Sequence, residues 1–238
     1  MIAGPIVLRL FLCVAAPGLA EAESAYRDGR YAEALDLFAE GLDEPGAPRG
    51  AVLYDMGNCA YRLGRLAEAL LHYERAALRI PRDPELLFNL RLTRRDLGLA
   101  DDAAGATLGA SVAAFVRSFA PEELLAAACG LETIGLGLLV LFRRRRGARN
   151  AAILVLLLAA ASGGRLVQVR FFPGPPRGIV LGDEIAVRPE PHADLEPAFR
   201  LEAGETVRVE ESSGRFVRVS HRKSGTGWTE AAGVGVVD

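Results

Sequence analysis

The residues best suited to chemistry in this sequence are three histidines and three cysteines, and their spacing does not suit a catalytic or metal site. His72 falls on an expected helix, whereas His192 and His221 fall in expected loops of a β domain. None of the three lies at metal-ligand spacing from a Cys, Asp or Glu, and no CxxC pair is present. The sequence also lacks a nucleophile-elbow serine, a phosphate-binding glycine loop and a nucleotide fingerprint. We therefore expect no enzyme and no bound metal or cofactor.

Two related segments indicate a fold that could instead bind a protein. Tyr26–Leu42 (YRDGRYAEALDLFAEGL) aligns with Tyr61–Ala77 (YRLGRLAEALLHYERAA) after a shift of 35 residues. Glycines match at the expected inter-helix turn, and alanines match where two helices would cross: Gly29 with Gly64, and Ala34 with Ala69. A repeat of this length and pattern resembles the tetratricopeptide repeat, in which pairs of helices stack into a solenoid. A bare helical bundle with coincidental spacing is the alternative.

The second unit is the fuller one, and it sets the expected bounds of the helical domain at residues 23–97. Gly57 and Ala69 should let two helices approach closely, while Tyr61 and Tyr73 fill the space around them. A third helix, Glu85–Leu97, should cap the stack. The resemblance implies a partner-binding groove lined by the first helix of each pair. The candidates are Tyr26, Arg27, Tyr54, Asn58, Tyr61, Arg62 and Asn89, whose residue types anchor interfaces or bond a peptide backbone. A solvated helix face would present similar residues.

Two apolar runs follow the repeats and predict a transmembrane hairpin. The first expected span covers residues 121–142 and the second covers 151–169, which includes Arg165 near its end. Each run is about long enough to cross a hydrocarbon core of about 30 Å as a helix. The loop between them, residues 143–150 (RRRRGARN), carries five arginines and no acid. A short basic loop stays in the cytoplasm, so the domains before and after the hairpin should both lie outside.

The N-terminal residues 1–22 are typical of a secretory signal. An apolar core leads to small residues suited to cleavage after Ala20 or Ala22. Arg9 interrupts that core and no basic residue precedes it, so an uncleaved anchor is the alternative; either way the next domain is exported. Residues 98–120 predict either a linker or a helix lying along the membrane surface.

The hydrophobic period changes after a Pro/Gly linker at residues 170–177. Residues 178–238 alternate as short strands separated by Gly, Pro and Ser turns. Their order resembles a bacterial SH3-like domain, which implies a small barrel. We expect its core from Val207, Val209, Phe216, Val217 and Val219. Phe199 and Trp228 are candidates for a ligand surface, although the only Trp of a small barrel is somewhat better suited to its core.

The order of these parts resembles the BatE family, protein E of the Bacteroides aerotolerance system. The most specific stretch is LYDMGNCAYRLGRLAEALLHYERAALRIPRDPELLFNL, residues 53–90. The resemblance implies a multi-domain, non-enzymatic protein of the bacterial inner membrane with both soluble domains in the periplasm. It also implies membrane-protein partners, namely other Bat proteins with von Willebrand factor A domains, in an aerotolerance or stress-related complex.

Two functions from different classes fit this organisation. The first is a scaffold that holds protein partners at the outer face of the membrane. The second is an envelope receptor whose barrel binds peptidoglycan or another wall ligand. The net charge of −2 argues against a nucleic-acid partner, and no small-molecule substrate is expected.

Overall fold

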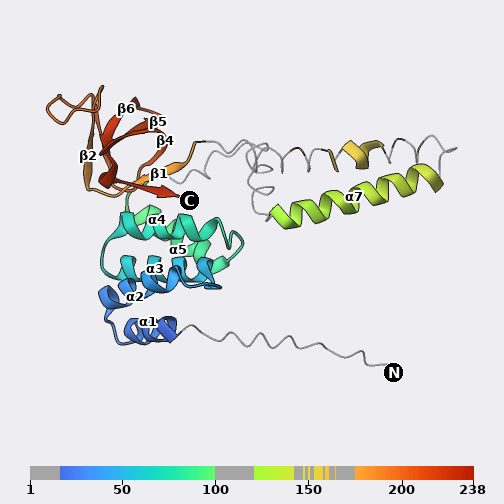
Figure 1. Cartoon of the computed structure of the whole chain (residues 1–238), viewed down its shortest axis with the longest axis horizontal. Helices are drawn as coiled ribbons and strands as arrows, with labels where there is room; N and C mark the ends of the chain where they lie inside the picture. Colours follow the sequence, from blue (N-terminus) through green and yellow to red (C-terminus); the bar gives the residue numbers. More distant parts are fainter. Residues whose placement is uncertain are drawn as a thin grey trace.

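A computed structural model of the chain describes residues 17–99, 121–141 and 175–238, together with 147, 150, 153–157, 159, 160 and 164 (Figure 1). Residues 1–16 of the expected signal lie outside the described residues. So do residues 100–120, which cover nearly all of the expected linker or interfacial helix, and most of the basic loop and second apolar run.

Five helices form the N-terminal domain, and each packs against the next along the chain (Figure 1). This serial packing is the arrangement of a helical solenoid. Helices α1 and α2 form the first repeat unit, and α3 and α4, which lie 35 residues later in the sequence, form the second. Helix α5 begins a third unit. The bounds are α1 Pro17–Arg27, α2 Tyr31–Leu42, α3 Arg49–Arg62, α4 Leu66–Ala77 and α5 Pro84–Asp96.

The first helix of each unit ends in the same glycine turn. Gly29, Gly64 and Gly98 have φ angles of +79°, +76° and +71°, a conformation that other residues rarely adopt. In each turn the next amide donates to a carbonyl five residues earlier, as Arg30 N does to Ala25 O at 2.9 Å. The recurrence at Gly98 shows that α5 is the first helix of a third unit. Asp83 caps that helix by accepting from two backbone amides at its start.

The helical core repeats as well. Ala22, Ala25, Ala34, Ala60, Ala69 and Phe38 are buried in one cluster with Tyr73. Ala22 and Phe38 occupy in the first unit the places of Gly57 and Tyr73 in the second, one repeat later. The helical domain therefore extends at least to Pro17, beyond the expected start at residue 23, since Leu19 and Ala22 of the expected signal pack into its core.

Helix α7 spans Pro121–Leu141, which coincides with the first expected membrane span. Within the part of the chain that the structure describes, no helix combines the length and apolar character needed to cross a bilayer. The expected transmembrane hairpin stays a prediction.

The C-terminal domain is an antiparallel β fold of two sheets. The larger has the order β6-β5-β4-β1-β7, and the smaller pairs β2 with β3. A bridge between Arg188 and Trp228 joins the two sheets, with both backbone N–H···O distances at 2.7 Å. The bounds are β1 Arg177–Val180, β2 Glu184–Val187, β3 Phe199–Glu202, β4 Thr206–Ser213, β5 Phe216–His221, β6 Gly225–Glu230 and β7 Val234–Val237.

The β core contains the valines expected from the sequence. Val207, Val217 and Val219 are buried in it, and Val209 packs against it partly exposed. Trp228 is only half-buried and lies outside the buried core residues, so the preference for a core position was wrong. Its strand pairs it with Arg218 rather than with an apolar side chain. Phe199 is also half-buried and packs against the core edge.

Candidate protein-binding surface and the domain junction

The seven side chains expected to face a partner are here called the first-helix surface: Tyr26, Arg27, Tyr54, Asn58, Tyr61, Arg62 and Asn89. Five of them are drawn into two groups of contacts, one around Asn58 and one around Arg62. A third contact joins Tyr61 to α5, because the Tyr61 hydroxyl donates to Asp96 Oδ2 at 2.6 Å.

Asn58 is the centre of the first group. Its side-chain oxygen accepts from the Tyr73 hydroxyl at 2.8 Å and from Asn89 Nδ2 at 3.1 Å. Asn89 Nδ2 also donates to the Tyr54 hydroxyl at 3.1 Å. The amide nitrogen of Asn58 donates to Asp55 Oδ1 at 3.3 Å. Asn58 therefore orders this group from within, and its own polar atoms are already satisfied.

Asp55 lies at the edge of this group and is half-buried. Burial raises the pKa of its carboxyl to about 6, against a smaller opposing effect of the hydrogen bond from Asn58. Burial also raises the pKa of the Tyr73 hydroxyl, so that this group stays a neutral donor to Asn58. The network is thus polar without a fixed charge at its centre.

Arg62 organises the second group at the junction of the first two units. Its guanidinium carbon lies 5.8 Å from the centre of the Tyr31 ring, and a hydrogen bond with the Tyr26 side chain raises its pKa. The rings of Tyr26 and Tyr31 meet edge to face at 5.3 Å between centroids. Arg27 lies one repeat before Arg62 and is exposed, with a surface ion pair to Glu23 at 3.9 Å.

Sequence reasoning missed four members of these groups: Tyr31, Asp55, Tyr73 as a hydrogen-bond donor, and Asp96. The repeat period could have predicted some of these contacts. Tyr54 bonds Asn89 and Tyr61 bonds Asp96, and both pairs are separated by 35 residues. Because neighbouring first helices lie side by side in a solenoid, residues one period apart are the ones that meet.

The opposite side of the second unit is occupied by the β domain. Helix α4 packs against β1 and β7, and Figure 1 shows this end of the sheet beside α4. Leu70 and Leu71 are buried there together with Ile179 and Val237. A Cβ atom at Gly235 would lie 2.3 Å from Leu71 Cδ2, so the Leu71 side chain would have to move to admit one. The two domains therefore meet through a packed apolar contact.

Polar contacts surround this apolar junction. Arg75 Nε donates to the Val236 carbonyl at 2.9 Å and lies 3.3 Å from Asp238 Oδ1. Glu74, whose side chain is buried, pairs with Arg94 from α5 and lies 3.6 Å from the Arg177 guanidinium of β1. A buried carboxylate requires such partners, since an unpaired charge there would be strongly destabilising.

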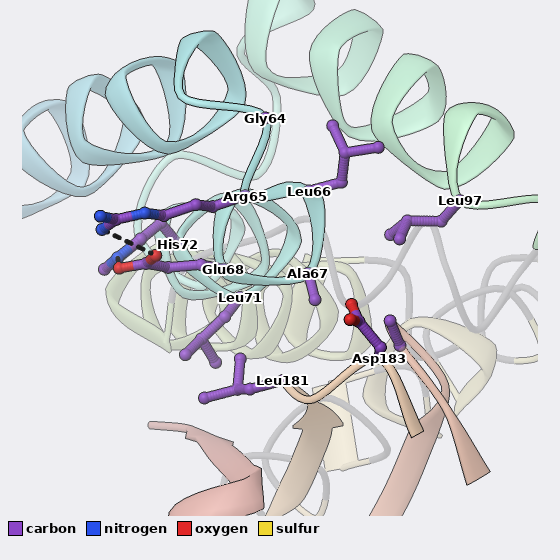
Figure 2. A pocket seen from close by; sticks show the side chains of 11 residues that line it. Gly64, Arg65, Leu66, Ala67, Glu68, Leu71, His72, Leu97, Leu181 and Asp183 are labelled. Carbon is purple, nitrogen blue, oxygen red and sulfur yellow. Dashed lines mark ion pairs between the residues drawn. The ribbon is translucent and has the colours of Figure 1, made fainter. Parts of the chain in front are cut away.

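A cavity of about 630 Å³ opens at one end of the junction (Figure 2). Figure 2 shows Arg65, Glu68 and His72 on the helical side and Leu181 and Asp183 on the β side. Among the described residues, His72 Nδ1 is buried without a hydrogen-bond partner. Burial, helped by the charge of Arg75, lowers the His72 pKa to about 4. His72 is therefore neutral at physiological pH.

No group of three His, Cys, Asp or Glu side chains that could hold a metal ion occurs among the described residues. Comparison with protein families identifies residues 25–91 as a tetratricopeptide repeat region. This confirms the repeat assignment for the helical domain, and repeats of this kind indicate a scaffold for protein–protein interaction. A search among curated proteins finds no match to the chain.

Proposed function

We propose that this chain, with its tetratricopeptide repeat region at residues 25–91, is a non-enzymatic scaffold that binds a protein partner through the first-helix surface. One observation carries the proposal: the side chains of this surface are ordered by contacts across successive repeats. Tyr54 and Asn89 hold each other in place, while the guanidinium groups of Arg27 and Arg62 are exposed.

Such ordering favours binding, because a partner need not immobilise these side chains itself. Tyr and Arg are also the residue types that most often dominate interface energies. The β domain supports the same choice of surface, since it already covers α4. A partner of the second repeat is therefore directed to α3 rather than to the covered face of α4.

We further propose that the chain is anchored in the bacterial inner membrane by a hairpin of residues 121–169. The two apolar runs and the five arginines at 143–149 support this. Both domains would then face the periplasm. A partner in the same membrane would meet them at high effective concentration, so a small repeat surface would suffice.

The resemblance to the BatE family supports a narrower version of this proposal. The partners would then be membrane proteins with von Willebrand factor A domains, in a complex that serves aerotolerance or stress resistance. The C-terminal β domain would be the SH3-like barrel of that family.

An envelope receptor is the second candidate function. Trp228 favours it, because a half-buried indole outside the β core is available to a ligand. Sedimentation of the full-length protein with purified cell wall tests this candidate. Loss of cosedimentation in a Trp228→Ala variant would support it, and no cosedimentation of the wild type would exclude it.

Co-purification from mild detergent tests the scaffold proposal. We expect the full-length protein to retain a specific protein partner, identified by mass spectrometry, and a double variant Arg27→Glu, Arg62→Glu to lose it. Arg79→Glu is the matched control, since Arg79 is exposed beyond the end of α4. Equal retention by the double variant and the control would contradict the proposal.

A further inference from the structure

A second cavity, of about 510 Å³, opens between α5 and the large sheet. It is here called the basic cavity, because five cationic side chains line it and only one acid does. The cations are Arg94, Arg177, Arg208, Arg222 and Lys223, and the acid is Glu205.

The strand register brings two of these cations together. Arg177 of β1 lies directly opposite Arg208 of β4, and Arg208 lies opposite Ser220 of β5. Residues directly opposite each other on neighbouring strands project from the same face of a sheet. Two residues further along β1, on this face, Ile179 packs against the helical domain. The side chains of Arg177, Arg208 and Ser220 therefore form a row at the junction.

This row is electrostatically unfavourable without a counter-charge. Like charges directly opposite each other on antiparallel strands are destabilising. The carboxylate of Glu74 partly neutralises the charge of Arg177, but it also forms an ion pair with Arg94. No acid among the described residues forms an ion pair with Arg208, Arg222 or Lys223. Five cations face the two carboxylates of Glu74 and Glu205, which leaves an excess of three positive charges.

Glu205 is itself engaged elsewhere. Its carboxylate accepts the backbone amide of Glu202 at 3.1 Å, and it lies 3.9 Å from His221 Nε2. It is therefore not placed to neutralise Arg208. Arg208, Arg222 and Lys223 are exposed, so their charges are accessible to an anion from outside the described chain.

We propose that the basic cavity binds the phosphate group of an anionic lipid headgroup. Guanidinium groups match phosphate oxygens in pairs, which favours phosphate for an arginine-rich site. The hydroxyls of Thr206 and Ser220 also line the cavity and can donate to the remaining oxygens. No Phe, Tyr or Trp is among the residues that line it, so it lacks the row of large aromatic rings typical of a single-stranded nucleic-acid site.

The connectivity of the chain favours a lipid as the source of this phosphate. Leu99 and Arg177 both line the cavity. Between them lie residues 100–174, which contain both apolar runs. The cavity therefore lies where the chain departs for those runs and returns from them, at headgroup level if they are embedded. Basic pockets between membrane helices bind anionic headgroups at the cytoplasmic face of membranes, and the same charge complementarity would operate at the periplasmic face. The choice of a lipid as the source of the phosphate rests on the membrane attachment proposed above, whereas the phosphate site itself does not.

Ligand-induced stabilisation of the full-length protein in uncharged detergent tests the proposal. Four probes are compared: phosphatidylglycerol, phosphatidylcholine, glycerophosphoglycerol and inorganic phosphate. The variants are Arg208→Gln and its matched control Arg200→Gln, since exposed Arg200 pairs with Glu184 at 3.1 Å away from the cavity. Arg208→Gln removes a cross-strand repulsion, so its folding is not at risk.

We expect phosphatidylglycerol to raise the melting temperature of the wild type and of Arg200→Gln in a saturable manner. Arg208→Gln should bind it at least about tenfold more weakly, in line with the loss of one charge-assisted contact. Equal affinity of Arg208→Gln and the control would overturn the phosphate site. Stabilisation by phosphatidylcholine as strong as by phosphatidylglycerol would do the same.

The soluble probes separate the source of the phosphate from its site. One outcome is that inorganic phosphate or glycerophosphoglycerol binds as tightly as the lipid and loses this affinity in Arg208→Gln. That result would support the phosphate site but contradict a lipid as the source of the phosphate. Extraction of cell membranes with carbonate is the separate check on attachment. Release of the chain by carbonate would contradict the proposed membrane anchor. Binding of the soluble phosphate probes at Arg208 does not depend on that anchor and would be judged separately.

Discussion

Gly57 lies directly against the ring of Tyr73. A Cβ atom at position 57 would lie 2.5 Å from Tyr73 Cε1 and 2.6 Å from Cδ1. Non-bonded carbon atoms do not approach that closely, so α3 and α4 can pack as they do only because residue 57 has no side chain. In the first repeat the equivalent positions hold Ala22 and Phe38, which are both buried in the same core cluster.

Replacing Gly57 with Ala should therefore destabilise the helical domain, although Ala is the better helix former by about 1 kcal/mol. Overpacking of this kind typically costs about 1–3 kcal/mol, and two ring atoms at such short distances place this contact toward the upper end, above the gain. Gly41→Ala is the control, since its new Cβ would meet the aliphatic side chain of Leu19, which can change rotamer, rather than a rigid ring. Thermal unfolding followed by circular dichroism should show the larger loss for Gly57→Ala. An equal or higher melting temperature for Gly57→Ala would show that the helices are not so closely packed.

Asn58→Ala should also destabilise the domain, even though Asn58 belongs to the first-helix surface. The change removes the acceptor for the Tyr73 hydroxyl, and Tyr73 is almost fully buried. An unsatisfied buried hydroxyl costs roughly 1–3 kcal/mol. Adding Tyr73→Phe to Asn58→Ala removes the orphaned hydroxyl and should recover part of the loss. If Asn58→Ala unfolded at the wild-type temperature, the network would not be structural.

The stability of the junction should depend on pH through His72. Its pKa is about 4 in the folded chain, whereas the ordinary value for a histidine side chain, taken for the unfolded chain, is 6.5. Between these values the unfolded chain binds a proton that the folded chain does not, so stability falls as pH decreases from 6.5 to 4. The full effect amounts to roughly 3 kcal/mol, since one pKa unit corresponds to about 1.4 kcal/mol.

The His72 effect must be separated from those of its neighbours. Glu68 lies 3.9 Å from His72 Nε2, and Asp55 has a raised pKa whose effect runs in the opposite direction, stability being lost as pH rises from 3.8 to about 6. The measurement is therefore the difference between the wild type and His72→Leu, from urea unfolding at several pH values. We expect this difference to favour His72→Leu increasingly as pH falls below 6.5. A difference independent of pH would show that His72 is not buried as a neutral group.

Processing of the N-terminus should spare α1. Cleavage after Ala20 or Ala22 would remove Leu19 and separate the start of α1 from the core. We therefore expect the mature protein to begin at or before Pro17, as determined by intact mass of the protein purified from a bacterial host. A mature chain that begins at Glu21 or Glu23 would contradict the role of α1 in the first repeat.

A pair of substitutions checks the same point without relying on processing. Leu19→Ala should destabilise the domain by about 2–5 kcal/mol, the usual range for a buried leucine. Glu21→Ala, in the same helix but exposed, should change the stability little. Equal effects of the two would place Leu19 outside the core.

The helical repeats could be predicted because their signals are local and periodic. Gly29 and Gly64 mark equivalent turns, and the same period also connects Tyr61 to Asp96. The start of α1 was obscured because small residues such as Ala22 suit both a cleavage site and a helix crossing. The valines of β4 and β5 likewise predicted the β core from their alternation.

The junction could not be predicted in the same way. Leu70 and Leu71 look like ordinary core residues of a helix pair, and nothing in the sequence indicates that β1 and β7 cover them. The row of Arg177 and Arg208 depends on the register of two strands far apart in the sequence, which the alternation pattern does not determine. Trp228 was misplaced for a related reason, since its environment depends on the bridge to Arg188.

Site-specific photo-crosslinking tests the central proposal, that the first-helix surface binds a protein partner, most directly. A photoreactive phenylalanine analogue is placed at Arg62, and at Arg79 as the control, in the full-length protein in its native cells. The account predicts a discrete crosslinked protein at position 62 that disappears when Arg27→Glu is added, with none at position 79. Absence of any crosslink at position 62, alongside a partner that still co-purifies, would contradict it.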